Sequence, residues 1–175
     1  ADNPKPPAKK NAGAPQAGEP TEMLIKHLRL NINAPGDKTD ADANVWFGYP
    51  QKWRDNSKRN RFQPLPVTGL GITDGYHLNA DAHAVANTDK PWLYTSGVIG
   101  PLDLKIHATN NQTDRFKVIL HFAEMANDST RVFGIDVNGE TISGLNIFKE
   151  AGAGKKAVTK VLDNVRLSDG VIRIK

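Results

Sequence analysis

The sequence predicts an antiparallel β-sandwich, on three observations. The 175 residues include 15 glycines and 11 prolines, and so many helix breakers leave few long helical runs. Several short runs alternate apolar and polar residues, which is the period of a strand with one buried face. Between two of these runs stands Asn138-Gly139, a pair that accepts the positive φ angles of a type I′ hairpin turn. About eight or nine such strands, joined by long loops in the first half, are typical of a sandwich.

The strands are expected in the following order. Leu24–Asn33 alternates apolar and polar side chains and ends at Pro35-Gly36. Residues 36–91 are irregular, with short apolar pieces at Val45–Tyr49 and Ile72–Leu78. Phe116–Phe122 has an apolar residue at every second position and is the clearest core strand. The other expected strands are Trp92–Ile99, Leu102–Ile106, Val132–Val137, Glu140–Ile142, Ala157–Val165 and Val171–Ile174.

The chain divides into a tail and a body. Residues 1–22 contain five of the eleven prolines and no large apolar residue, so they bury nothing that offsets their ordering entropy and are predicted to be a disordered linker or tail. Residues 23–175 form the predicted sandwich domain. No stretch approaches the roughly 20 apolar residues of a membrane-spanning helix. Cysteine is absent, which excludes disulfides, thiolate nucleophiles and cysteine-ligated metals.

The net charge of +4 comes from one short segment. Residues 52–61 carry five basic side chains against Asp55, and the aromatic residues Trp53 and Phe62 stand within or beside this run. A basic run with aromatics can bind phosphate backbones and stack bases. Ten residues are a small electrostatic footprint, so nucleic acid is not the expected partner. The alternative is a solvated surface loop that keeps the protein soluble.

No catalytic constellation stands out, and the chain is not expected to be an enzyme. Gly69–Gly75 lacks the spacing of a dinucleotide loop, and Gly152–Lys156 lacks the Ser or Thr of a phosphate loop. The five histidines form no H-x-x-x-H pair. His121 and Glu124, three apart on or after a strand, are expected on opposite faces.

One acidic cluster has the oxygen spacing of a calcium loop. Asp40, Asp42 and Asn44 occupy alternate positions shortly after Asp37, and hard cations prefer such oxygen ligands. The segment is not an EF-hand, because Val45 stands at the glycine position. The alternative is a polar turn closed by side-chain hydrogen bonds. Calcium is therefore the only candidate cofactor.

The tryptophans and tyrosines gather in the loop-rich first half. Ring faces on loops can pack against the CH groups of a sugar, while the alternative is that they close the ends of the sandwich core. These residues are Trp46, Tyr49, Trp53, Tyr76, Trp92 and Tyr94.

The second half resembles a malectin or malectin-like domain. The resemblance rests on LHFAE (120–124), RVFGIDVNGETI (131–142), LNIFKEAGAGKKAV (145–158) and the closing DGVIRI (169–174), supported by LRLNINAPG (28–36) and LYTSG (93–97). It implies a jelly-roll β-sandwich of the galactose-binding-like type that binds glycans through loop residues and accompanies larger extracytoplasmic proteins.

The resemblance also implies candidate ligand-binding residues. Tyr76 stands where the animal lectin of the family has a contacting tyrosine, and Tyr94 is the tyrosine of the central strand. Ala126 and Asn127 stand where that lectin has an aromatic pair, so the disaccharide site differs here. A sugar site is then expected to use other loop residues as well, namely Tyr49, Trp53 and Asn146.

The chain stops at Lys175, where family members continue into a final strand. The resemblance therefore implies a sandwich lacking that strand, as a fragment, a processed chain or a subunit completed by a neighbour. A protein partner or the missing C-terminal segment is expected to pair with the last strand. Two functions follow: a non-catalytic glycan-binding lectin module of an extracytoplasmic protein, or a structural docking domain of a larger extracytoplasmic assembly that has lost the sugar site.

Overall fold

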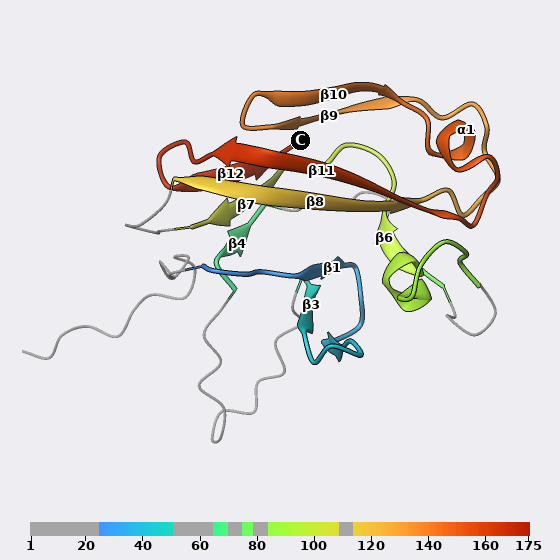
Figure 1. Cartoon of the computed structure of the whole chain (residues 1–175), viewed down its shortest axis with the longest axis horizontal. Helices are drawn as coiled ribbons and strands as arrows, with labels where there is room; N and C mark the ends of the chain where they lie inside the picture. The colour runs from blue at the N-terminus through green and yellow to red at the C-terminus, as the bar shows by residue number, and fades with distance from the viewer. Residues whose placement is uncertain (1–24, 51–64, 70–74, 79–83, 109–113) are drawn as a thin grey trace, which may run out of the picture.

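The computed structural model describes residues 25–50, 65–69, 75–78, 84–108 and 114–175. Figure 1 shows a nearly all-β molecule. Its largest sheet has five strands in the order β10-β9-β12-β7-β4. These strands are β4 (Val67–Thr68), β7 (Leu104–His107), β9 (Phe133–Val137), β10 (Glu140–Leu145) and β12 (Val171–Ile174).

The two longest strands pack against this sheet. β8 (Arg115–Ala123) and β11 (Ala157–Arg166) form an antiparallel pair. Side chains from this pair and from the five-stranded sheet share one core, in which Val137 and Val165 are both 0% exposed. The β-sandwich that the sequence predicts is therefore confirmed, with Phe116–Phe122 as a core strand.

Shorter strands complete the fold beside β8. β3 (Val45–Tyr49) pairs parallel with β1 (Leu30–Ile32) and antiparallel with β2 (Lys38–Thr39). β5 (Gly75–His77) pairs antiparallel with β6 (Ser96–Val98). The β1–β3 pair is parallel, as is the isolated bridge between Ala86 and Lys156, whereas the other strand pairs of the described residues are antiparallel.

The hairpin at Asn138-Gly139 is confirmed. Both residues have positive φ, 51° and 91°, and the flanking strands pair as Glu140 with Val137. These are the φ signs of a type I′ turn, whose twist matches that of the strands.

The structure differs from the sequence prediction at several places along the chain. Residues 92–99 do not form one strand, because Pro91 begins a short 3₁₀ helix, η1 (Pro91–Tyr94), before β6; proline has the φ of a first helical turn and no N–H to leave unpaired. A short helix, α1 (Ile147–Ala151), stands where no helix was predicted. The first strand begins only at Leu30, and Leu24 lies outside the described residues.

The prediction that the last strand presents an unpaired edge is wrong. β12 lies inside the five-stranded sheet, with β7 on one side and β9 on the other. Lys175 exchanges backbone hydrogen bonds with Asp136 at 2.9 and 3.0 Å, so pairing continues to the end of the chain. A further segment therefore has no free edge of β12 to join. No helix in the part of the chain that the structure describes is long and apolar enough to cross a membrane.

Candidate functional site

The outer face of the β8–β11 pair is partly open. Alternate residues of β8 point away from the main core, and Ile119 is 47% exposed. Val161 of β11 lies directly opposite it and is 46% exposed. The next pair along the strands, His121 with Thr159, is also exposed. These four side chains form an exposed surface of apolar and hydrogen-bonding groups, which we call the floor.

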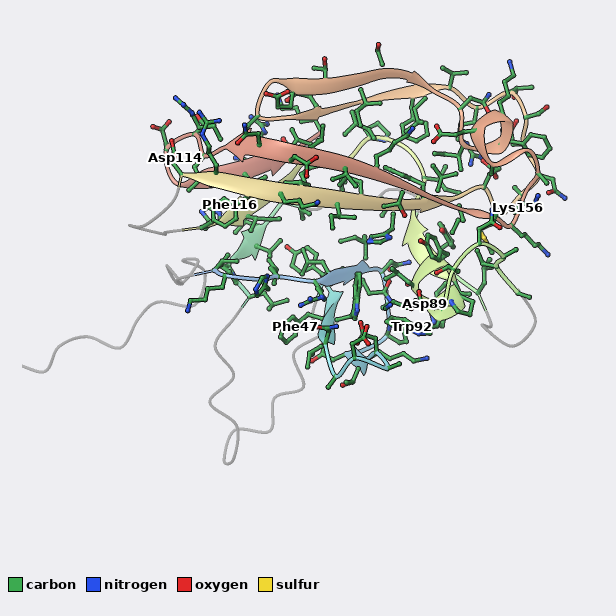
Figure 2. The ribbon with its side chains drawn as sticks, in the orientation of Figure 1. Phe47, Asp89, Trp92, Asp114, Phe116 and Lys156 are labelled. Carbon is green, nitrogen blue, oxygen red and sulfur yellow. The ribbon has the colours of Figure 1, made fainter. Side chains whose placement is uncertain are left out.

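Aromatic rings lie against the His121 end of this floor. The Trp46 ring lies edge-on to His121, with centroids 5.5 Å apart, and edge-on to Trp92 at 6.1 Å. The Tyr94 ring lies 6.0 Å from His121. Figure 2 shows Trp92 next to Asp89 at the end of the molecule where η1 lies. We call Trp46, Trp92, Tyr94 and His121 the aromatic ledge.

The ledge belongs to a second, smaller core. Trp46, Val85, Leu93 and Tyr94 are buried together, and Ala123 of β8 and Ala157 of β11 pack against them. Phe122, one residue before Ala123, packs against the main core instead. Because successive side chains of a strand point to opposite faces, the second core covers the outer face of one end of the β8–β11 pair. The aromatic ledge lies at the border between this covered end of the strand pair and the exposed floor.

Asp40 holds Trp46 in place. Its carboxylate accepts hydrogen bonds from Trp46 Nε1 at 3.1 Å, from the backbone N–H groups of Asp42 and Asn44 at 3.1 and 2.9 Å, and from Asn44 Nδ2. Burial acts to raise the pKa of Asp40, but these hydrogen bonds outweigh it and lower the pKa to about 2. Asp40 is therefore ionised throughout the physiological range.

The predicted calcium residues form a turn closed by N–H donors. Both oxygens of Asp40 accept hydrogen bonds, and Asp37 Oδ1 accepts one from the backbone N–H of Gly48 at 2.9 Å. Asp42 is exposed. Over residues 25–50 and the other described ranges, no group of three or more His, Cys, Asp or Glu side chains is placed to hold a metal. Calcium at Asp37, Asp40, Asp42 and Asn44 stays a prediction.

His121 is the ledge residue with polar atoms open to a ligand. Contact with the Trp46 and Tyr94 rings removes water from part of the imidazole, which lowers its pKa below the ordinary 6.5, and the positive charge of Lys90 lowers it further. The ring is therefore neutral at pH 7. Nδ1 lies 3.2 Å from the Tyr94 hydroxyl. A neutral imidazole has one donor and one acceptor nitrogen, and Nε2 remains to exchange a hydrogen bond with a ligand.

Charged side chains surround the rings. Lys38 Nζ lies 4.8 Å from the centroid of the Trp92 ring, a cation–π contact. Lys90 donates to Asp89 Oδ2 at 2.7 Å. Asp89 itself has a side chain that is 77% exposed. Donors of both lysines and acceptors of Asp89 thus stand beside an aromatic surface, a combination that suits a polyhydroxylated ligand.

The other predicted ligand-binding residues make internal contacts. Tyr49 donates its hydroxyl to Val67 O at 3.3 Å, and Tyr94 is only 5% exposed. Asn146 is the N-cap of α1: its Oδ1 accepts from the Lys149 N–H and its Nδ2 donates to a backbone carbonyl. Trp53 lies outside the described residues.

Tyr76 joins β5 to β6 rather than facing outward. Its hydroxyl donates to Tyr94 O at 3.2 Å, and its ring covers Gly97, where an added Cβ would lie 2.9 Å from the hydroxyl. Burial raises the pKa of Tyr76 to about 12, and the negative charge of Glu124 contributes. The structure brings Tyr94 into the ledge and places Tyr76 one hydrogen bond away, while Tyr49 and Asn146 lie elsewhere. Their role as sugar ligands stays a prediction.

Glu124, the acid of the FAE motif, organises the turn after β8. It is 4% exposed, accepts from the backbone N–H of Ala126 at 2.8 Å and from Arg131 Nη1 at 2.6 Å, and so fixes both ends of the turn. His121 is exposed whereas Glu124 is buried. Their placement on opposite faces stays a prediction, because Glu124 lies just beyond the end of β8.

Sequence reasoning did not select Trp92, His121 and Lys38 as site residues. Trp46 and Trp92 belong to the aromatic residues noted in the sequence. Their contact depends on the packing of η1 against β3, since the two residues are 46 positions apart in the chain. The signal available in the sequence was the position of His121, which alternates with the apolar residues of Phe116–Phe122 and is therefore expected to face outward.

Comparison with known proteins identifies the family. A model of the malectin domain matches residues 29–175, and the chain belongs to the malectin domain family. It is 29% identical over 114 residues, 60% of its length, to a probable LRR receptor-like serine/threonine-protein kinase of Arabidopsis thaliana. The matched part is 11% of that kinase.

Solved structures share the fold. The ectodomain of ANX2 from Arabidopsis thaliana superposes with a TM-score of 0.60 at 14% identity, covering 84% of this chain and 42% of that one. A β-glucuronidase of Bacteroides uniformis superposes with a TM-score of 0.60 at 17% identity, covering 85% of this chain and 16% of that one. The chain thus spans less than half the length of each of these proteins.

Proposed function

We propose that this chain is a non-catalytic glycan-binding module of an extracytoplasmic protein, and that the glycan lies on the floor of β8 and β11 against the aromatic ledge. The observation that carries the proposal is that exposed side chains and rings adjoin one another. Ile119 and Val161 lie beside His121 on the strand pair, His121 contacts the Trp46 ring, and the Trp46 ring contacts the Trp92 ring. Membership of the malectin family supports it, and the ectodomain relatives support the location.

The chemistry of the surface suits a sugar. Apolar side chains and a ring edge can pack against the CH groups of a pyranose, while hydroxyls exchange hydrogen bonds with the polar groups beside them. Thr159 and His121 Nε2 supply such groups on the floor, and Lys38 and Asp89 supply them at the rim. Asp40 already fixes the Trp46 ring, and Thr95 Oγ1 donates to the backbone carbonyl of Trp92 at 2.9 Å, which fixes the backbone of η1 beneath the Trp92 ring. Binding therefore orders few groups.

The experiment is a glycan array with the purified chain, with and without calcium, followed by titration of the best glycan against variants. Trp92→Ala and His121→Ala are expected to weaken binding by at least about tenfold, as truncation of an anchor residue does. The matched control is Val132→Thr, an exposed residue away from the ledge, with affinity unchanged. Tyr76→Phe tests the other site, the one that the family resemblance implies. It weakens binding if the glycan contacts Tyr76, and leaves binding unchanged if the glycan lies on the ledge. A blank array with a folded protein would refute the proposal.

The second candidate function is a structural docking domain. The observation that favours it is that β8 pairs with β11 alone among the strands that the structure describes, together with the internal contacts of Tyr49 and Asn146. In that case the folded chain binds another polypeptide and no glycan.

A further inference from the structure

β8 has a hydrogen-bonded neighbour on one side only. In the five-stranded sheet, β9, β12 and β7 each lie between two partners, whereas β8 pairs with β11 alone among the strands of the described residues. A strand directs about half of its backbone N–H and C=O groups to each side. One side of Phe116–Phe122 therefore presents a row of groups that no described strand pairs.

The core beside this edge is incompletely covered. Most core-facing side chains of the five-stranded sheet are buried, including Val137 at 0%, Leu104 at 3% and Ile172 at 5% exposed, and three are partly exposed: Ile106, Phe133 and Ile142. The core-facing side chains of β8 are large and apolar, and all four remain partly exposed: Phe116, Val118, Leu120 and Phe122.

β1 packs against the same core as β8. In the view of Figure 1, β1 runs below β8, on the side away from β11. Its Leu30 and Ile32 pack against the same core and are also only partly buried. β1 pairs with β3 and makes no ladder with β8 in the described ranges. Two strands thus share a core without sharing hydrogen bonds, and both leave apolar side chains partly uncovered.

The edge lacks two of the features that keep sheet edges unpaired, a proline and a bulge. Natural proteins block exposed edges with proline, bulges, inward charges or charged side chains along the edge, lysine above all. Phe116–Phe122 contains no proline, and the register shift of this pair lies on β11, between Leu162 and Val165. Its one lysine, Lys117, points outward to Asp163 Oδ1 at 3.0 Å. The edge is therefore competent for strand pairing.

We propose that the free edge of β8, on the side of β1, accepts an extended strand from a partner polypeptide. The chemistry of the site sets two requirements. The row of backbone groups on Phe116–Phe122 is matched by another extended backbone, and the uncovered side chains repeat every second residue, so the partner strand has apolar residues at alternate positions. Its polar residues then face outward with Lys117 and Ile119.

The test uses hydrogen exchange of the intact chain, followed by NMR, with a synthetic nonapeptide of alternating valine and threonine. In the free chain, slow and fast amides are expected to alternate along 116–122, since only one side of β8 is paired. With the peptide, the fast amides slow by about tenfold or more, as amides gaining a ladder hydrogen bond do. A peptide with threonine in place of every valine has no effect.

A pair of variants on β8 controls the test. Leu120→Thr faces the core and weakens peptide binding, whereas Lys117→Thr faces outward and leaves it unchanged; circular dichroism verifies that both fold. Uniform protection of 116–122 in the free monomer would overturn the proposal, because the edge would already be covered. Protection by the peptide at other strands, or no change at 1 mM peptide, would overturn it as well. A dimer that protects β8 without peptide would assign the edge to a second copy of the chain instead.

Discussion

Asn138 ties three strand ends together, and replacing it tests how this half of the sandwich is held. Its Nδ2 donates to Val171 O at 2.7 Å and to Arg166 O at 2.8 Å, and its Oδ1 accepts from the Arg173 N–H at 2.8 Å. Its backbone has φ of 51° in the turn between β9 and β10. One side chain therefore links this hairpin to the end of β11 and to β12.

The expected cost of Asn138→Ala follows from these contacts. A net hydrogen bond contributes about 1 kcal/mol. The bond to Arg166 O is exposed and counts for less, so the three bonds together contribute about 2–3 kcal/mol. The left-handed conformation costs an alanine about 1 kcal/mol more. The free energy of unfolding is expected to fall by about 3–4 kcal/mol, which is large for a turn residue.

The assay is urea unfolding at neutral pH with the m-value held common across variants. Asn138→Asp keeps the acceptor and tolerates positive φ but loses both donated bonds, so it is expected to lose about 2 kcal/mol. Asn87→Ala is the matched control for the backbone cost, because Asn87 is exposed with φ of 62°. An Asn138→Ala protein within 1 kcal/mol of the parent, or an Asp variant equally destabilised, would refute the reasoning.

Three further predictions concern other parts of the molecule. Because the pKa of Asp40 is about 2 in the folded chain against an ordinary 3.8, its contribution to stability is full above pH 3.8 and is lost as pH falls toward 2; Asp40→Asn should flatten that part of the pH profile of the unfolding midpoint. Val137→Ala removes two methyl groups from a fully buried site and should cost about 2 kcal/mol in urea unfolding, with Val132→Ala, 59% exposed, nearly neutral. Glu124→Gln weakens the bond to Arg131 and should speed exchange of the Ala126 amide; unchanged exchange would contradict the role assigned to that carboxylate.

The strongest part of the sequence prediction concerned local pattern. The alternation in Phe116–Phe122 and the Asn138-Gly139 turn both depend on neighbouring residues, because side-chain period and positive φ are properties of the chain within a few positions. The same local logic failed directly after Pro91, where a strand was expected from Trp92 and a 3₁₀ turn formed. There, proline at a helix start outweighed the apolar run that follows it.

The candidate site and the strand edge depended on contacts that no local pattern contains. Trp46 meets Trp92 and His121 only because β3, η1 and β8 come together. The sequence by itself determined that the chain is a β-sandwich of the malectin family with a turn at Asn138. Only the tertiary structure placed the last strand between β7 and β9, left one side of β8 without a partner among the described strands and brought the rings of the aromatic ledge together. The physical reason is that strand order and ring contacts are set by which surfaces bury one another across the whole chain, and a period of two residues carries no information about the neighbour a strand will find.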